Sequence, residues 1–390
     1  MLDYGLSLLF FCRFVGRPVV FFIVIIFTMR FFFILATLLL FLSNPATAQQ
    51  QNYKVIAYYT GTAEALAEHP LDKLTHVIYS FMRLKNDTLT VANEKQAENL
   101  KKIVAYKKQY PHLKIMVSIG GWGGCGPCSD LFASAQHRKT FAKTTVELFE
   151  QYGVDGLDLD WEYPAIEGYP GHKYTPEDRQ NFTELVKTLR QEMGNKYLLT
   201  FAAGGFDQFL EESVDWAAIM PHLDFVNLMT YDLTSGFSKY TGHHTPLHSN
   251  KKQKQSTSNC VQWLLRHKVP SGKLIIGAAF YARIWEDVRD VEHGLYQGGQ
   301  FKTSVPYKNF DAYFSAEKGY QYYFDKKSKA PYYYNAKDYL FATFDDKKSI
   351  ALKVKYLKKK QLGGIMFWEL SQDTRTNGLV EEIDRQLKSK

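Results

Sequence analysis

Short runs of apolar, β-branched and aromatic residues recur along the chain and alternate with longer amphipathic stretches. Such runs are typical of buried parallel strands, and the stretches between them are typical of crossover helices. Strands are predicted at 53–59, 76–81, 113–119, 156–162, 198–203, 224–230, 273–280 and 363–369. Eight strands with crossovers in one domain predict an α/β fold, a (β/α)8 TIM barrel. The alternative is an open doubly wound sheet, which usually has fewer strands and a phosphate-binding first turn.

Helix signals lie between several of these strands. One helix is expected over 136–151 and another over 176–193. Thr175 and Pro176 stand at the cap positions of the second helix, and Gly194 follows its end, as helix punctuation predicts.

One segment breaks the alternation. Between Arg283 and about Tyr339 the chain is rich in aromatic residues and shows no clear helix repeat. We predict a small α+β insertion over 284–340, between strands seven and eight, which divides the barrel into 49–283 and 341–390. The aromatic residues concerned are Tyr307, Phe310, Tyr313, Tyr320, Tyr322, Tyr323, Tyr332, Tyr333 and Tyr334. They are interpreted as the small core of the insertion rather than as sugar platforms.

The first 48 residues are interpreted as a leader. A basic start and an apolar run from Met29 end in Ala46-Thr47-Ala48, the pattern of a secretory signal peptide over 29–48. The apolar residues 1–28 indicate either a start codon placed too early or a membrane anchor. We expect a secreted monomer, extracellular or periplasmic, without membrane attachment once the leader is removed.

The charge of the chain is mildly basic. The formal net charge of +8 falls to +6 without the leader, which holds three arginines and one aspartate. The lysines of one predicted helix are interpreted as a solvated face. These are Lys353, Lys355, Lys358, Lys359 and Lys360. No zinc-finger spacing, P-loop or RNA-binding signature is present, so no nucleic-acid partner is expected.

Cysteines are few. Cys12 lies in the leader, and Cys125, Cys128 and Cys260 remain. Cys125-Gly126-Pro127-Cys128 follows a Gly-rich loop, where a loop-stapling disulfide is favoured over two free thiols and over redox catalysis. The Gly-rich run lacks the Lys-Ser/Thr ending of a phosphate cradle, and we expect neither a cofactor nor a metal.

Three acids form the most informative pattern. Asp158, Asp160 and Glu162 alternate along a predicted strand and therefore share one face. Packing like charges together costs free energy unless some are protonated or hydrogen-bonded. Carboxyls whose pKa values are pushed apart are what glycosidic bond cleavage requires. A calcium loop or a solvated face is the alternative, but the apolar residues between the acids and their spacing disfavour it.

The sequence resembles glycoside hydrolase family 18, the chitinases, in five motifs that follow the family's order. They lie at 118–122, 155–164, 229–232, 281–283 and 366–369, each near a predicted strand end. The insertion is similar to that of the chitotriosidase-like subgroup. The resemblance implies hydrolysis of β-1,4 links between N-acetylglucosamine units, without a cofactor.

The resemblance also implies roles for the acids. Glu162 would act as general acid and then as general base. The substrate's acetamido oxygen would be the nucleophile in a retaining reaction. Asp160 would hydrogen-bond the acetamido N–H, Asp158 would share a proton with Asp160, and Tyr231 would hold the acetamido carbonyl.

Further residues are expected to bind substrate. Asp232, Met229 and Arg283 would shape the reacting subsite, and Trp368 would form its apolar floor. Cleft-lining roles are implied for Tyr58, Phe81, Trp122 and Tyr281, for which barrel filling is the alternative. Phe237 stands where many relatives place a tryptophan, and the loop after the first strand lacks one as well.

Other functions remain open at this stage. Loss of the general acid would leave a chitin-binding lectin, a function that Glu162 disfavours. An endo-N-acetylglucosaminidase or a peptidoglycan hydrolase would usually lack the insertion. Exo or endo action, processivity and the natural polymer are not determined by the sequence.

Overall fold

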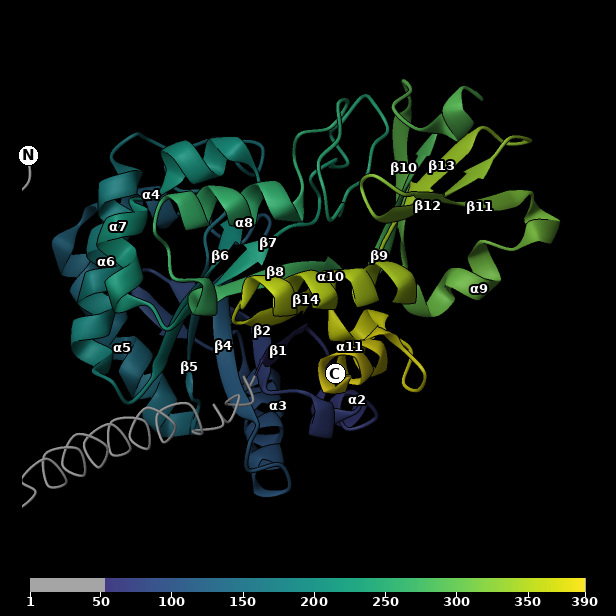
Figure 1. Ribbon diagram of the computed structural model, residues 1–390. Coiled ribbons are helices and arrows are strands. Elements are labelled where there is room, and N and C mark those ends of the chain that lie inside the picture. The colour runs from purple at the N-terminus through teal and green to yellow at the C-terminus, as the bar shows by residue number, and fades with distance from the viewer. Residues whose placement is uncertain (1–52, 390) are drawn as a thin grey trace, which may run out of the picture. The chain divides into compact units, whose positions relative to one another are not determined.

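The computed structural model describes residues 53–389, and within them eight parallel strands close into a barrel (Figure 1). The barrel strands are β1 (Lys54–Tyr59), β2 (His76–Lys85), β4 (Lys114–Gly120), β5 (Gly156–Asp160), β6 (Leu198–Gly204), β7 (Phe225–Met229), β8 (Leu274–Ala279) and β14 (Gly364–Trp368). Strand β1 pairs with both β14 and β2, which closes the sheet. A short strand, β3 (Thr88–Thr90), pairs antiparallel with β2. The predicted (β/α)8 barrel is confirmed, and closure rules out the open sheet.

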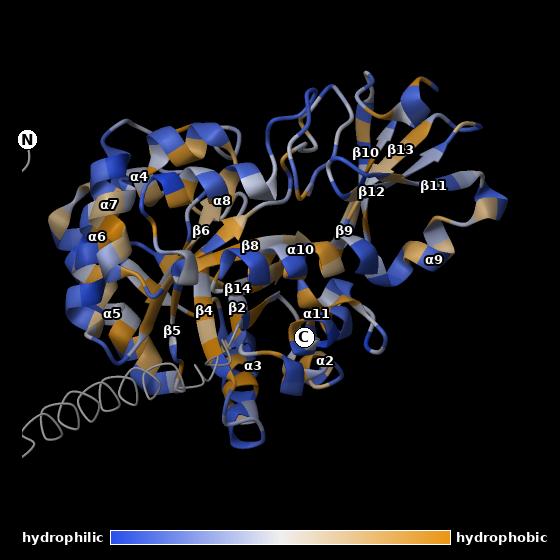
Figure 2. Ribbon diagram, viewed as in Figure 1, coloured by the Kyte–Doolittle hydropathy of each residue, from blue (hydrophilic) through white to orange (hydrophobic). Residues whose placement is uncertain are grey.

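Helices surround the barrel in the order expected for crossovers (Figure 1). They are α2 (Ala63–Leu66), α3 (Glu94–Ala105), α4 (Cys128–Ala133), α5 (Ala135–Tyr152), α6 (Asp178–Met193), α7 (Trp216–Ile219), α8 (Thr257–Arg266), α10 (Lys347–Lys360) and α11 (Leu379–Lys388). Hydrophobic residues concentrate on the strands and hydrophilic ones on the outer helices (Figure 2). Most of the core therefore lies between the strands and the helices.

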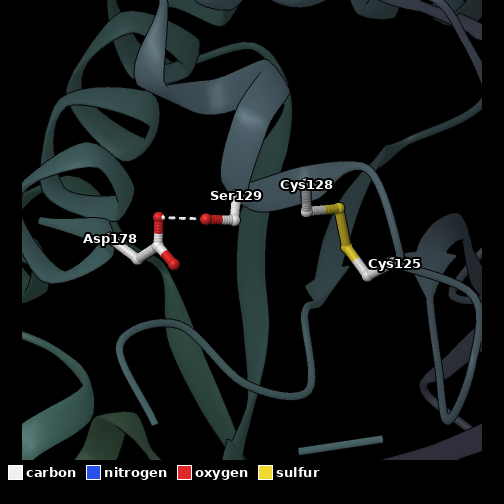
Figure 3. Close-up of a disulfide and its surroundings, with 4 residues drawn as sticks. All are labelled: Cys125, Cys128, Ser129 and Asp178. Atoms are coloured by element: carbon white, nitrogen blue, oxygen red, sulfur yellow. Dashed lines mark hydrogen bonds between the residues drawn. A yellow bond between two sulfur atoms is a disulfide. The ribbon is translucent and has the colours of Figure 1, made fainter. Parts of the chain in front are cut away.

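Two predicted boundaries were wrong by two residues, and the predicted end of the second strand, 81, was wrong by four because β2 continues to Lys85. Strand β5 ends at Asp160 rather than at residue 162. Helix α6 begins at Asp178, because the Asp178 carboxylate accepts hydrogen bonds from the Thr175 backbone N–H and the Ser129 hydroxyl, at 2.9 Å each. Figure 3 shows Ser129 directed toward Asp178. The fully buried Asp178 thus holds the preceding turn, which contains Pro176, outside the helix.

The segment of the chain between β8 and β14, the last two barrel strands, forms a second sheet. Its five antiparallel strands are ordered β10-β9-β13-β12-β11. They are β9 (Tyr281–Glu286), β10 (Gln300–Pro306), β11 (Tyr320–Asp325), β12 (Ala330–Asn335) and β13 (Leu340–Thr343), with the short helix α9 (Phe310–Tyr313). The α+β insertion predicted between strands seven and eight is confirmed, and its sheet extends from Tyr281 to Thr343. Many of its aromatic residues form an internal core, although Tyr322 is 41% exposed.

The interpretation of Lys353 as a solvated residue was wrong. Its side chain is fully buried, and Nζ lies 2.5 Å from both Asp345 Oδ2 and Thr245 Oγ1. Lys353 shares the inner face of α10 with Ile350 and Leu357, three and four residues away, so it points toward the barrel. The lysines at 355 and 359 are exposed.

The structure contains a disulfide between Cys125 and Cys128, with a Cα–Cα distance of 5.2 Å (Figure 3). Both residues are buried at the start of α4, and Cys260 is a free buried thiol. The loop-stapling interpretation is thus confirmed.

The predicted leader, residues 1–48, lies outside the described residues. Among the helices of the described range, none has the length and apolarity needed to cross a membrane. The proposed boundaries of the barrel segments remain predictions.

Candidate active site

The three acids lie at the carboxyl end of β5, the barrel face on which catalytic residues gather. Trp161, between two of them, points the other way. Its ring centroid is 5.8 Å from that of Phe132 and 6.2 Å from that of Phe182. The alternation predicted from the sequence thus continues to Glu162, which is partly exposed, whereas Asp158 and Asp160 are buried.

Asp158 is the best-satisfied of the three acids. Its carboxylate accepts hydrogen bonds from four side chains on four other strands of the barrel. The donors are Tyr58 OH at 2.8 Å, Ser118 Oγ at 3.3 Å, Thr200 Oγ1 at 2.6 Å and Asn227 Nδ2 at 3.0 Å. Burial raises the pKa of Asp158, and these hydrogen bonds oppose the rise. Ser118, Thr200 and Asn227 were not predicted as partners of Asp158. The only indication in the sequence was that each is a polar residue at an inward-facing strand position.

Asp160 contrasts with its neighbour. Its side chain is 4% exposed, and its Oδ1 atom has no hydrogen-bond partner among the described residues. Burial, with the charges of Glu162 and Asp158, raises the pKa of Asp160 well above its usual value. A buried polar atom without a partner is costly, so Asp160 is available to a ligand group.

Glu162 carries the pKa expected of a general acid. Partial burial, aided by the negative charge of Asp232 and opposed by a hydrogen bond with Tyr163, raises the pKa of Glu162 to about 7. A carboxyl that remains protonated near neutral pH can donate a proton to a leaving group, and general acids operate best when their pKa is near the working pH.

Tyr231, Met229 and Tyr281 lie together at the carboxyl ends of β7 and β8. The rings of Tyr231 and Tyr281 are 6.4 Å apart, and Tyr231 OH is 3.9 Å from Met366 Sδ. Burial raises the pKa of Tyr231 well above its usual value, so the phenol keeps its proton and can donate a hydrogen bond.

Asp232 forms an ion pair with Arg283. The guanidinium donates through Nε to Oδ1 and through Nη2 to Oδ2, the latter at 2.6 Å. His244 Nδ1 lies 3.4 Å from Asp232 Oδ1. Burial alone would raise the pKa of Asp232, but hydrogen bonds from Arg283 and His244 hold it well below its usual value. His244 was not predicted, because its position after the strand-six motif carries no recognisable signal.

Aromatic rings border the acids. Trp368 stacks on Phe81 at 5.8 Å between centroids and lies 5.8 Å from Tyr58. Tyr58 is 1% exposed and its hydroxyl is committed to Asp158, so this structure places it in the barrel interior rather than on a cleft wall.

Two rings are well exposed near Glu162. Trp122 is 47% exposed and Phe237 is 67% exposed, with 5.9 Å between their centroids. Trp122 also lies 5.6 Å from Tyr169 and 6.5 Å from Tyr163, neither of which the sequence singled out. An exposed indole can stack on the C–H face of a sugar.

Comparisons with known proteins agree with this geometry. The model of glycosyl hydrolases family 18 matches residues 54–373. Chitinase A1 of Niallia circulans is 31% identical, over 85% of this chain and 58% of its own length. Mouse chitotriosidase-1 is also 31% identical, over 82% of this chain and 73% of its own length.

Solved structures give the same result. A family 18 N-acetylglucosaminidase of Paenibacillus barengoltzii superimposes with a TM-score of 0.78 and 34% identity, covering 86% of this chain and all of its own. Chitinase ChiA74 of Bacillus thuringiensis gives a TM-score of 0.81 and 28% identity, covering 86% of this chain and 70% of its own. The family match spans most of the chain and includes all three acids, so this protein belongs to glycosyl hydrolases family 18 and is a glycoside hydrolase.

Proposed function

We propose that the enzyme hydrolyses the β-1,4 links of chitin or chito-oligosaccharides with retention of configuration, using the substrate's acetamido group as nucleophile. One observation carries the proposal. Glu162 has the pKa of a general acid, while its neighbour Asp160 is buried with an unpartnered oxygen. Asp158 is held by four donors and is enclosed in the barrel, which is a poor environment for a nucleophile.

The reaction proceeds in two displacements. Glu162 donates its proton to the glycosidic oxygen, and the C1–O bond breaks as the acetamido oxygen bonds to C1. The product is a cyclic oxazolinium ion. Glu162, now a carboxylate, takes a proton from water, whose oxygen bonds to C1 and reopens the ring. Each displacement inverts C1, so the product keeps the β configuration.

Asp160 and Tyr231 position the acetamido group in this scheme. An acetamido N–H supplies the hydrogen-bond donor that Asp160 lacks, and positive charge on the oxazolinium favours the ionised form of Asp160. Tyr231 donates to the acetamido carbonyl. The proton that the family resemblance assigns jointly to Asp158 and Asp160 is part of this proposal, and the nearby charge of Asp158 helps to raise the pKa of Asp160.

The subsite walls and the location of the protein are part of the proposal. Trp368 forms the apolar floor, and the exposed rings of Trp122 and Phe237 extend a sugar-stacking surface. The names of the relatives, chitinase and chitotriosidase, support this substrate class. A disulfide supports an oxidising compartment and hence secretion with the signal over 29–48.

A second candidate is an exo-acting N-acetylglucosaminidase that releases single sugars. The 34% identity to the Paenibacillus N-acetylglucosaminidase supports cleavage at N-acetylglucosamine, and the products released separate exo from endo action. The chitinase and the exo-acting enzyme share the chemistry above and differ only in the products released.

Products from three hexasaccharides test the proposal. Fully acetylated chitohexaose should be cleaved, whereas fully deacetylated chitohexaose and cellohexaose should not, because both lack the nucleophile. Single sugars among the earliest products would select the exo-acting candidate, and dimers or larger fragments would select the chitinase. Cleavage of cellohexaose at a comparable rate would contradict the mechanism.

A further inference from the structure

His244 is buried where three parts of the molecule meet: the segment after β7, the start of β9 and the end of β13. Its side chain is fully buried, with Nδ1 3.4 Å from Asp232 Oδ1 and its ring 5.2 Å from that of Tyr281. Its backbone N–H donates to Thr343 Oγ1 at 3.2 Å, at the end of the insertion sheet. Its backbone carbonyl accepts from the N–H of Leu233 at 3.0 Å. The residue therefore contacts both the side chain of Asp232 and the backbone that follows it.

The next residue anchors this junction. Thr245 Oγ1 lies 3.0 Å from Asp345 Oδ2, and Lys353 Nζ contacts both of these atoms. The Lys353–Asp345 pair has no exposed surface on either side chain. A fully buried ion pair is costly to break, so it fixes the backbone on which His244 is carried.

The contacts of the imidazole specify its tautomer. A proton on Nδ1 gives Asp232 a donor and leaves only the Nε2 lone pair without a partner. A proton on Nε2 would instead place the Nδ1 lone pair opposite a lone pair of Asp232 Oδ1. It would also bury an Nε2–H without an acceptor, since Nε2 has no hydrogen-bond partner among the described residues. A doubly protonated ring would bury that same N–H and would add a positive charge that the Arg283 cation disfavours. The neutral Nδ1–H form satisfies these contacts best.

We infer that His244 is a positioning residue for hydrolysis: its neutral imidazole donates from Nδ1 to Asp232 and holds that carboxylate where its charge acts on Glu162. This inference rests on the proposed function of Glu162. Asp232 follows the end of β7 with a positive φ of 54°, a conformation that needs support from its surroundings. Arg283 binds both carboxylate oxygens, and His244 Nδ1 approaches Oδ1 as well.

The charged groups around the imidazole set the direction of the effect. Asp232 and Asp345 are anionic neighbours, Arg283 and Lys353 are cationic, and the Tyr281 ring is neutral. Burial lowers the pKa of His244, which keeps the ring neutral in the working range. The His244 N–H offsets part of the Asp232 charge that raises the pKa of Glu162. Removing this donor should raise that pKa further, and the basic limb of the kcat/KM profile should move to higher pH.

Three variants test the inference. His244→Leu fills the space without a donor. It should lower kcat/KM roughly tenfold, the scale of one hydrogen bond to a charged group. It should also move the basic limb up by about half a pH unit. His244→Asn retains an N–H donor and should restore most of the activity and the original limb. The matched control is His243→Asn, since the equally buried His243 contacts Asp325 instead, at 3.2 Å, and should leave the limb unchanged.

Two outcomes would overturn the inference: a folded His244→Leu protein with the wild-type limb, or equal displacements in the His243 and His244 variants. If His244→Leu does not fold, nitrogen-15 NMR of the histidine side chains in the wild-type protein shows which ring nitrogen of His244 carries the proton. The ring should be protonated on Nδ1 alone from pH 5 to 8, and protonation on Nε2 would exclude the donor role. This measurement does not depend on catalysis. It therefore tests the hydrogen bond from His244 Nδ1 to Asp232 even if the assignment as a chitinase is wrong.

Discussion

At the scale of single residues, the proposed reaction depends on Glu162. Its burial places the pKa of the carboxyl at about 7, so the protonated form is present below that pH and is lost as pH rises through it. We predict that Glu162→Gln abolishes hydrolysis but retains oligosaccharide binding, because an amide has the same shape but cannot donate a catalytic proton. The loss should be about 10²–10⁴-fold or greater.

Hydrolysis rates and calorimetric binding of a chito-oligosaccharide check this prediction together. Glu167→Gln is a matched control, because Glu167 lies on the same loop and shows no ion pair in the described structure. Its rate should equal that of the wild type. A Glu162→Gln protein that keeps a rate within about tenfold of the wild type would remove Glu162 from the role of general acid.

The three acids could be predicted because their alternation is a local pattern that survives in β5 and just beyond it. The partners of Asp158 could not, since Ser118, Thr200 and Asn227 come from three other strands whose alignment exists only in the closed barrel. The position of His244 could not be predicted either, because His244 lies on a loop that is held by a hydrogen bond to Thr343 of the insertion.

At the scale of elements, the loop after β4 is closed by the disulfide and carries the exposed Trp122 at its start. Gly123 and Gly126 in this loop approach Tyr169 and His172, so the loop packs on the segment that follows Glu162. The bridge therefore constrains the loop that follows the indole.

Thiol titration tests the bridge in the secreted protein. The chain after residue 48 holds three cysteines, and denaturation without a reductant should expose one reactive thiol, that of Cys260. Reduction before denaturation should raise the count to three. Three reactive thiols without reductant would mean that Cys125 and Cys128 are not joined in solution.

Most elements could be predicted because their apolar periodicity is local, whereas the errors arise where a distant residue intervenes. Helix α6 starts late because Asp178 is bound by Ser129, a residue far away in the sequence. Lys353 was predicted to be solvent-exposed because it is charged, although it lies on the inner face of α10. Its partner Asp345 could not be identified from the sequence.

At the scale of the whole molecule, closure of the barrel gathers the site from segments distant in the sequence. β5 supplies Asp158 and Asp160, the segments after β5 and β7 supply Glu162 and Asp232, β14 ends in Trp368, and β9 of the insertion adds Arg283. The insertion thus contributes to the site directly, because Arg283 forms an ion pair with Asp232, whose charge acts on Glu162. Asp158 is held by four donors inside the barrel, and the proposed mechanism assigns the role of nucleophile to the substrate's acetamido group.

The anomeric configuration of the first product tests the two-displacement course most directly, and the deacetylated and cellulosic hexasaccharides then separate the substrate's nucleophile from a carboxylate of the enzyme. Proton NMR during the first minutes of chito-oligosaccharide hydrolysis distinguishes the α and β forms before mutarotation mixes them. Two displacements at C1, by the acetamido oxygen and then by water, predict that the initial product is the β anomer. An initial α anomer would show a single displacement by water and would contradict the substrate-assisted mechanism.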